Sequence, residues 1–355
     1  MRVLMVVIRT GMTTTSTHMA HVRELDEGLR PVGLGPPRPS SAGRRAGRRG
    51  RRLRSPRFHC SVRATLPARC SGRCCRSWRS RESCVVTGRW PSPRSYSPAV
   101  RTVGIDLAAG DAGTAVCVIA WADGLATVEE LSRGSNDGEL VAVCVDTSVA
   151  KVGVDCPFGW PEPFVDAMTD HRTQRGWPGP GSSSPEEFNR SLRYRTTDLH
   201  VHRCTGTWPL SVSTDRIGVT AMRCASLLDT LVKRQVPVDR VGTGKVMEVY
   251  PAAALGIWHV RQRGYKKPTD ESRTKLAAMV DALRKQLPGL RLDTNHEALC
   301  RTSHDAFDAL VSALVARAGA LSLTVPPQTD EQRRIAATEG WIHLPRTEPR
   351  RLLAG

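Results

Sequence analysis

The sequence predicts an α/β fold in which a mixed five-stranded sheet is flanked by helices and follows a disordered N-terminal tail. Short apolar runs separated by turn residues begin at residue 101, and such runs are typical of buried strands. Several later segments carry apolar residues at helical spacing, whereas the first 100 residues show no sustained apolar period. With 355 residues, the chain is long enough for one or two domains.

The N-terminal tail holds nearly all of the positive charge of the chain. The whole sequence has a formal net charge of +18, and residues 1–100 contain 21 Arg, no Lys and four acidic residues, a balance of +17. The remainder has 31 basic side chains (52 less 21) and 30 acidic ones (34 less 4), a balance of +1. The charge of the folded part therefore gives no support for a nucleic-acid partner.

Three interpretations of the tail remain open. Its Arg, Pro, Ser and Gly composition cannot bury enough apolar surface to offset the entropy of ordering, which indicates simple disorder. A basic arm that binds nucleic acid has the same composition. The absence of Lys also suits upstream sequence translated from a gene start assigned too early. We expect a tail over residues 1–99, a folded domain over 100–346 and a C-terminal tail over 347–355.

The folded part opens with a meander and a crossover. A capping-box pattern at residues 136–139 predicts a helix that ends near Thr147, and Asp123-Gly124 is a hairpin signal. The apolar run at 151–155 suits a central parallel strand. Three antiparallel strands, a helix and a buried parallel strand are the opening of an RNase H-like sheet. The five strands are expected at 102–106, 114–121, 125–131, 151–155 and 245–250.

The second half of the folded part is expected to be irregular at first and then helical. After residue 161 the periodic pattern is lost, and residues 176–185 are rich in Gly, Pro and Ser, which predicts a long loop. A short segment at 341–344 ends the fold. The helices are expected at 218–234, 269–287, 304–321 and 331–338.

Four aspartates indicate a site for a hard cation. Asp106 and Asp155 each end a buried strand, and Asp305 and Asp308 lie one turn apart at the start of an apolar helix. An isolated buried carboxylate is costly unless it is paired, protonated or bound to a metal, and Mg²⁺ or Mn²⁺ prefers carboxylate oxygens. Each residue also has a structural interpretation, as a turn residue for the strand pair or as a helix-dipole partner for the helical pair.

Four further residues are candidates for the same site. Glu248 is a charge within a strand, and we expect it to point inward toward the aspartates. Arg195 and Asp198 form either a structural ion pair or, through the arginine, a clamp for a substrate phosphate. Lys266 holds a phosphate or belongs to a solvated loop.

The cysteines and the hydropathy of the chain indicate a cytoplasmic protein. Cys117, Cys144 and Cys156 lie in apolar runs and are expected to be small buried side chains. No spacing suggests a disulfide framework, which suits a reducing compartment. No apolar stretch is long enough to cross a membrane.

Together these motifs resemble the domain-of-unknown-function family 429, which is described as predicted nucleases with an RNase H fold. The resemblance covers about residues 101–345. It implies hydrolysis of phosphodiester bonds in DNA or RNA, with catalytic Asp106, Asp155, Glu248, Asp305 and Asp308. The helical aspartate pair also resembles the Holliday-junction resolvase branch of that fold. The matching segments are 104–106, 153–161, 195–198, 248–251 and 305–310, of which 155–161 (Asp-Cys-Pro-Phe-Gly-Trp-Pro) and 305–310 (Asp-Ala-Phe-Asp-Ala-Leu) are the most specific.

We expect two ions, bridged by Asp106, with Asp155 and Asp308 on either side and Asp305 or Glu248 completing the shell.

One alternative is an ATP-dependent kinase or ATPase related to actin and hexokinase. In that case residues 104–114 grip phosphate, and the glycines at 242–244 contact adenosine. Another alternative is a non-catalytic binding module of the same fold. The choice between DNA, RNA and a small phosphodiester stays open, as does the oligomeric state.

Overall fold

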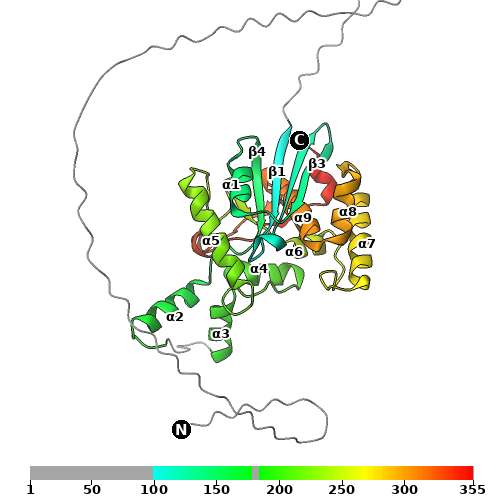
Figure 1. Ribbon diagram of the computed structural model, residues 1–355. Coiled ribbons are helices and arrows are strands. Elements are labelled where there is room, and N and C mark those ends of the chain that lie inside the picture. Colours follow the sequence, from blue (N-terminus) through cyan, green and yellow to red (C-terminus); the bar gives the residue numbers. More distant parts are fainter. Residues whose placement is uncertain (1–98, 178–183, 355) are drawn as a thin grey trace, which may run out of the picture. The chain divides into compact units, whose positions relative to one another are not determined.

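The computed structural model describes residues 99–177 and 184–354 (Figure 1). The expected N-terminal tail, except for Ala99, lies outside the described residues, and so does the centre of the expected loop at 178–183. The described residues confirm the α/β class, with a mixed sheet that is flanked by helices.

Six strands form the main sheet, in the order β5-β4-β1-β2-β3-β6. Strand β2 is antiparallel to both of its neighbours, β1 and β3, whereas β4 pairs in parallel with β1 and β5 pairs in parallel with β4. The prediction of five strands is short by one, because β6 pairs in parallel with β3 through only two residues, too few for any periodic pattern. The strands are β1 (Val100–Asp106), β2 (Ala115–Ala122), β3 (Leu125–Arg133), β4 (Val149–Asp155), β5 (Val246–Glu248) and β6 (Leu290–Arg291).

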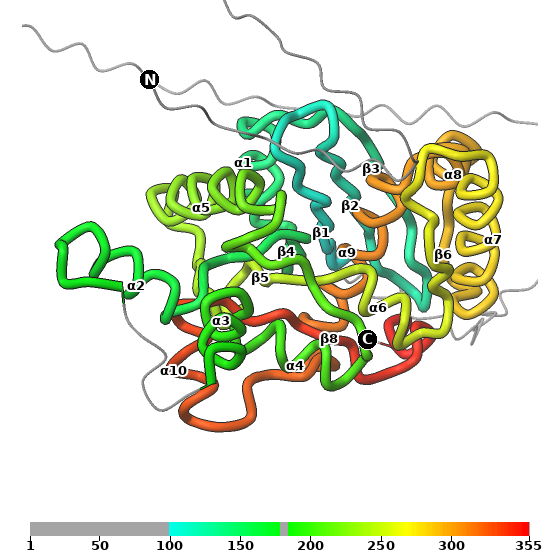
Figure 2. The backbone as a smooth tube through the Cα atoms, turned by 90° about the horizontal axis from the view of Figure 1, so that it is seen from below, coloured from blue at the N-terminus to red at the C-terminus, as the bar shows by residue number. Residues whose placement is uncertain are grey.

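Helices cover both faces of this sheet (Figures 1 and 2). On one face, Leu140 of the first helix and Leu227 of the fifth pack with Val103 and Ile105 of β1. On the other face, α9 packs against β1, β2 and β4, α8 contacts β3, and α7 packs on α8. Strand β2 is therefore buried on both sides, as its unbroken apolar sequence requires. The two groups are α1 (Asp137–Val145) with α5 (Gly218–Lys233), and α7 (Asp270–Gln286) with α8 (Thr294–Thr302) and α9 (His304–Ala320).

Helices with strong end signals lie where the sequence predicts them. Both halves of the predicted capping box are present at α1, where Asn136 and Glu139 bond each other's backbone N–H. Ser303 accepts the N–H of Ala306 at the start of α9. The predicted helices at 218–234, 269–287 and 304–321 agree with α5, α7 and α9 to within one residue, and α10 (Asp330–Glu339) is one residue longer at each end than predicted.

The prediction of an irregular segment after residue 161 is wrong. Three helices lie there, and two of them, of 11 and 9 residues, bury a single residue each, Ala167 and Leu192, so neither is long enough for a repeated apolar pattern. The third buries Thr197 and Asp198 beside Val201, which hides it from a hydropathy pattern. They are α2 (Glu162–Arg172), α3 (Pro185–Arg193) and α4 (Thr196–Thr205), and the short α6 (Pro251–Ile257) and α8 were likewise not predicted.

The C-terminal segment is part of the fold and not a tail. A 3₁₀ helix covers Pro349–Leu353, Leu352 is buried, and Arg317 of α9 donates to the Leu352 carbonyl at 3.2 Å. Before it, β7 (Thr324–Val325) and β8 (Leu344–Pro345) form a separate two-stranded sheet.

Two other expectations concern cysteines and membranes. Cys117, Cys144 and Cys156 are buried and free, as predicted. Within the residues that the structure describes, none of the helices is long and apolar enough to cross a membrane.

Candidate functional site

Helix α9 lies directly on the backbone of β1. Because side chains alternate along a strand, Thr102, Gly104 and Asp106 face α9, while Val103 and Ile105 enter the opposite core. A Cβ at Gly104 would lie 2.0 Å from the Ala309 carbonyl oxygen, so only glycine allows this approach. Thr102 Oγ1 donates to the carbonyl of Ala313 at 3.0 Å.

The same contact continues onto β4. In the parallel register Gly153 lies beside Gly104 and Asp155 beside Asp106. A Cβ at Gly153 would approach the Ser312 carbonyl oxygen to 2.6 Å. The helix thus crosses both strands where each has a glycine two residues before its terminal aspartate.

This packing brings three of the four predicted metal ligands together. Asp106, Asp155 and Asp308 each offer a carboxylate oxygen, and these oxygens lie within 4.8 Å of one another. Asp308 is fully buried, whereas Asp106 and Asp155 are partly exposed. The three residues come from β1, β4 and α9, so their meeting depends on the tertiary fold.

The crowding of these carboxylates disfavours their charged forms. Burial, followed by repulsion from Asp155 and Asp308, raises the pKa of Asp106 well above its usual range. Burial also raises the pKa of Asp155 to about 7. A group of acids that resist ionisation is a group that a bound cation would stabilise.

Lys266 neutralises the deepest carboxylate. Its Nζ lies 2.5 Å from Asp308 Oδ2, and the hydroxyl of Tyr265 donates to Asp308 Oδ1 at 2.9 Å. Burial alone would lower the pKa of Lys266, but attraction to Asp308 and the neighbouring acidic groups raises it well above its usual value. The sequence left open whether Lys266 holds a substrate phosphate or belongs to a solvated loop; in the structure it pairs with the Asp308 carboxylate.

Asp305 lies outside the group of three. Its carboxylate is 2.5 Å from Arg133 Nη2 and 2.7 Å from His304 Nδ1. Burial would raise the pKa of Asp305, but these two neighbours hold it below its usual value. Asp305 and Asp308 do lie one turn apart on α9, as predicted. Asp305, however, lies in the first turn of the helix and pairs with Arg133 of β3.

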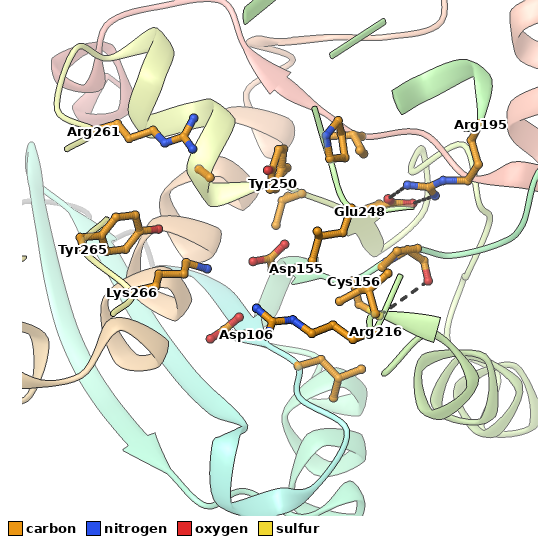
Figure 3. Close-up of a pocket in the computed structure, with 18 of the residues that line it drawn as sticks. Asp106, Asp155, Cys156, Arg195, Arg216, Glu248, Tyr250, Arg261, Tyr265 and Lys266 are labelled. Carbon is orange, nitrogen blue, oxygen red and sulfur yellow. Dashed lines mark hydrogen bonds and ion pairs between the residues drawn. The ribbon is translucent and has the colours of Figure 1, made fainter. Parts of the chain in front are cut away.

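Glu248 points inward, as predicted, but not toward the aspartates. It pairs with Val154 in the register of β4 and β5, so it leaves the sheet on the face opposite to Asp155. Its two oxygens accept from Arg195 at 2.9 and 2.7 Å (Figure 3). One of them also accepts the Phe158 N–H at 3.0 Å. Glu248 is therefore not available as a metal ligand.

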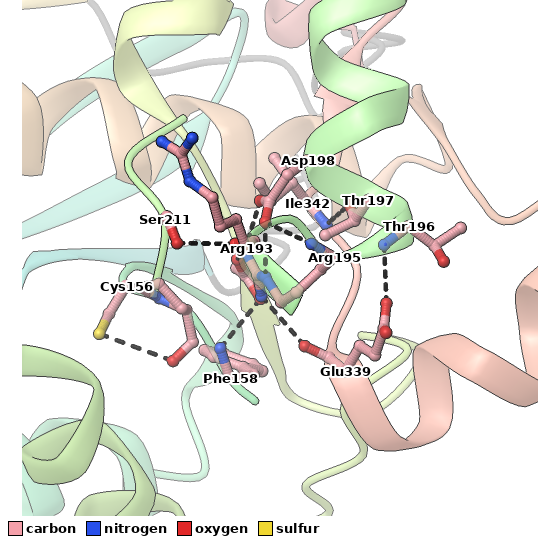
Figure 4. Close-up of polar contacts among 12 residues, drawn as sticks. Cys156, Phe158, Arg193, Arg195, Thr196, Thr197, Asp198, Ser211, Glu339 and Ile342 are labelled. Carbon is pink, nitrogen blue, oxygen red and sulfur yellow. Dashed lines mark hydrogen bonds and ion pairs between the residues drawn. The ribbon is translucent and has the colours of Figure 1, made fainter. Parts of the chain in front are cut away.

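Arg195 is a structural brace and not a phosphate clamp. The side chain is 1% exposed, and every guanidinium N–H has a partner; Figure 4 shows Arg195 with two of these partners, Asp198 and Glu339. It donates to Asp198 from Nε and Nη2, to Glu248 from Nη1 and Nη2, and to the carbonyl of Glu339 from Nη1. Because Asp198 lies in α4, Glu248 in β5 and Glu339 at the end of α10, the contacts tie three elements together.

A pocket of about 490 Å³ opens above the aspartates (Figure 3). Asp106 and Asp155 line it, and so do four basic residues, of which only Lys266 forms an ion pair among the described residues, with Asp308. Two of these, Arg216 and Arg261, were missed by sequence reasoning because they lie in connections between helices, where no pattern singles them out. The four basic residues are Arg216, Arg261, Lys266 and Lys267.

The two loops that suggested ATP binding have internal partners. Lys151 Nζ donates to the carbonyls of Gly242 and Gly244, which holds the glycine loop to β4. Arg223 of α5 donates to the Ala108 carbonyl and to Thr114 Oγ1 in the loop after β1. These contacts give both loops a structural role.

Comparison with curated proteins and with solved structures gave no match. Residues 104–332, which include all three clustered aspartates, match the family described as "Protein of unknown function (DUF429)". The match covers well over half of the chain, and the chain belongs to the DUF429 family.

Proposed function

We propose that this protein is a metal-dependent hydrolase of phosphodiester bonds, with Mg²⁺ or Mn²⁺ held by Asp106, Asp155 and Asp308. One observation carries the proposal: carboxylates from β1, β4 and α9 converge beneath a pocket whose walls are basic. Hard cations prefer oxygen ligands. A cation bound here would stabilise negative charge on the attacking and leaving oxygens of a phosphodiester.

The ligand set fits one ion more readily than the two we expected from the sequence. Asp106 and Asp155 face the pocket, but Asp308 is already bound by Lys266 and Tyr265. Lys266 is 45% exposed, so its flexible side chain has room to move away from Asp308. A second ion would require that movement.

The arrangement of the first four strands supports an RNase H-like fold. Three antiparallel strands are followed by α1 and by β4, which returns parallel to β1 at the centre of the sheet. In this arrangement the two strand-end aspartates lie side by side. A nuclease of that class is the specific form of the hydrolase that we propose, with nucleic acid as its substrate.

The proposal is tested with the full chain carrying Asp106→Asn, assayed on structured and single-stranded DNA and RNA with Mg²⁺ or Mn²⁺. We expect cleavage to fall by at least about 100-fold, the upper end of the effect of changing an outer-shell partner of a metal. Asp123→Asn is the matched control, because Asp123 is exposed at the β2–β3 turn with φ of 51°, which asparagine also adopts. Metal-dependent cleavage at the wild-type rate in Asp106→Asn would refute the assignment.

A further inference from the structure

We infer that the pocket binds a nucleotide-sized phosphate ester through Arg216, Arg261 and Lys267, which line it together with Asp106 and Asp155. The inference rests on the proposed function for the reaction that follows binding, and it narrows the substrate class. The ester is a free nucleotide or a nucleotide of an unpaired strand. A base-paired duplex is excluded as the pocket ligand.

Arg216, Arg261 and Lys267 have fewer ion pairs and side-chain hydrogen bonds than Arg195, which lines the same pocket. Among the described residues, neither Arg216 nor Lys267 has an ion pair or a side-chain hydrogen bond. Arg261 donates from Nη1 to Thr207 Oγ1 at 2.8 Å, but its Nε is buried and has no hydrogen-bond partner. Arg195, which lines the same pocket, has every N–H satisfied. A buried donor without an acceptor costs free energy, so Nε of Arg261 points to an acceptor supplied by a ligand.

The positions of these side chains suit an anion held between them. Figure 3 shows the guanidinium groups of Arg261 and Arg216 on opposite sides of the pocket, with Asp155 between them in this view and Asp106 beside Arg216. Arg261 follows α6 and Arg216 precedes α5, so two separate connections supply the charges. A guanidinium binds phosphate oxygens through paired N–H donors. The ligand is therefore a phosphate bound from two sides.

The rest of the wall suits the organic part of a nucleotide. Apolar side chains from several elements line the pocket beside the basic ones, and Leu210 among them is 48% exposed. Sites for small molecules combine mainly apolar walls with a few polar groups that fix orientation. The apolar lining includes Leu107, Pro157, Pro209, Leu210, Ile217 and Val249.

The size of the pocket and the charge of the surrounding fold exclude a duplex. The volume of about 490 Å³ is in the range of small-molecule sites, roughly 300–1,000 Å³. A specific duplex interface buries about 1,000–2,500 Å² of protein surface and needs a basic stripe. Residues 101–355 have a charge balance of only +1, so the positive charge of the folded part is local.

The test measures binding without catalysis, in buffer that contains EDTA. The full chain is titrated with a mononucleotide, with a short single-stranded oligonucleotide and with a duplex of the same sequence. We expect Arg216→Met and Arg261→Met each to weaken mononucleotide or single-strand binding by about tenfold or more, since hydrogen bonds to charged groups are strong. Arg263→Met, which removes the same charge from an exposed residue that does not line the pocket, is the matched control.

The two ligand sources give different results. Arginine-dependent binding of the mononucleotide identifies a free nucleotide, and arginine-dependent binding of the oligonucleotide alone identifies an unpaired strand. Any duplex binding is expected to be unchanged by both substitutions, because the 21 arginines of residues 1–100 also attract it. Binding of the mononucleotide and the oligonucleotide that both substitutions leave unchanged, or no binding of either, overturns the inference. Because no divalent ion is present, that failure is distinct from persistent cleavage by Asp106→Asn, which would overturn the proposed function.

Discussion

The burial of Arg195 leads to a prediction that distinguishes a structural role for this residue from a phosphate-binding role. Replacing Arg195 with methionine keeps most of the apolar stem and removes the guanidinium. Asp198 and Glu248, which are 0% and 2% exposed, then lose the cation that neutralises them. The Glu339 carbonyl loses a donor at the same time.

The size of the effect follows from that burial. Removing one partner of a buried ion pair costs about 3–5 kcal/mol, because the other charge stays buried without compensation. For a folded unit of about 250 residues, each kcal/mol lowers the melting temperature by roughly 2–4 °C. We therefore expect Arg195→Met to melt roughly 6–20 °C below the wild type.

Thermal unfolding followed by circular dichroism measures this difference. Arg261→Met is the matched control, because it removes an arginine of the same pocket that has a single side-chain hydrogen bond, to Thr207. We expect that control to change stability by only about 1 kcal/mol, the net contribution of one hydrogen bond. If Arg195→Met melted with the wild type and instead lost nucleotide binding, Arg195 would be the phosphate clamp and the brace would be wrong.

Three further predictions follow from the packing and charge of the site. Gly104→Ala should cost about 1–3 kcal/mol or more by pushing α9 off β1, whereas Gly256→Ala, where an added Cβ meets nothing within 4 Å, should be neutral or slightly stabilising in thermal unfolding. Lys266→Met should bind Mn²⁺ several-fold more tightly in a calorimetric titration, because Asp308 loses its competing cation; weaker binding would refute that role. Because the pKa of folded Asp155 is raised to about 7, metal-free stability should fall as the pH rises from about 4 to about 7, while Mn²⁺ affinity should rise; a flat affinity between about pH 6 and pH 8 would contradict this.

The sequence predicted those helices and strands whose signals come from residues close together in the chain. Strands β1 and β4 follow from short apolar runs, and α1 follows from the reciprocal bonds of Asn136 and Glu139, which involve residues only three apart. Helices α2 and α3 were not predicted because each is short and buries a single side chain, so neither has enough apolar residues to repeat a helical period. Helix α3 begins with a capping box of Ser184 and Glu187, whereas α2 begins after Pro161 without a side-chain cap. A cap at the start of a short helix is a weak signal by itself.

The acidic residues show the limit of that reasoning most clearly. The sequence identifies buried carboxylates, since a charge at the end of an apolar strand or on an apolar helix is unusual wherever its partner lies. It does not identify the partner. Glu248 meets Arg195, which is 53 residues away, and Asp305 meets Arg133, which is 172 residues away.

Asp106 and Asp155 differ from Glu248 and Asp305 in one respect that decides their chemistry. The register of β1 with β4 sets them side by side at the pocket, with no arginine bonded to either among the described residues. Burial and mutual repulsion then raise the pKa of Asp106, and no guanidinium offsets this. A carboxylate with an arginine is already neutralised and adds stability to the fold, whereas two adjacent carboxylates without one retain affinity for a cation from solution. The acidic residues that the sequence presents as one candidate site therefore form two groups. Glu248 and Asp305 are paired with arginines, whereas Asp106 and Asp155 have no arginine partner among the described residues and belong to the candidate metal site.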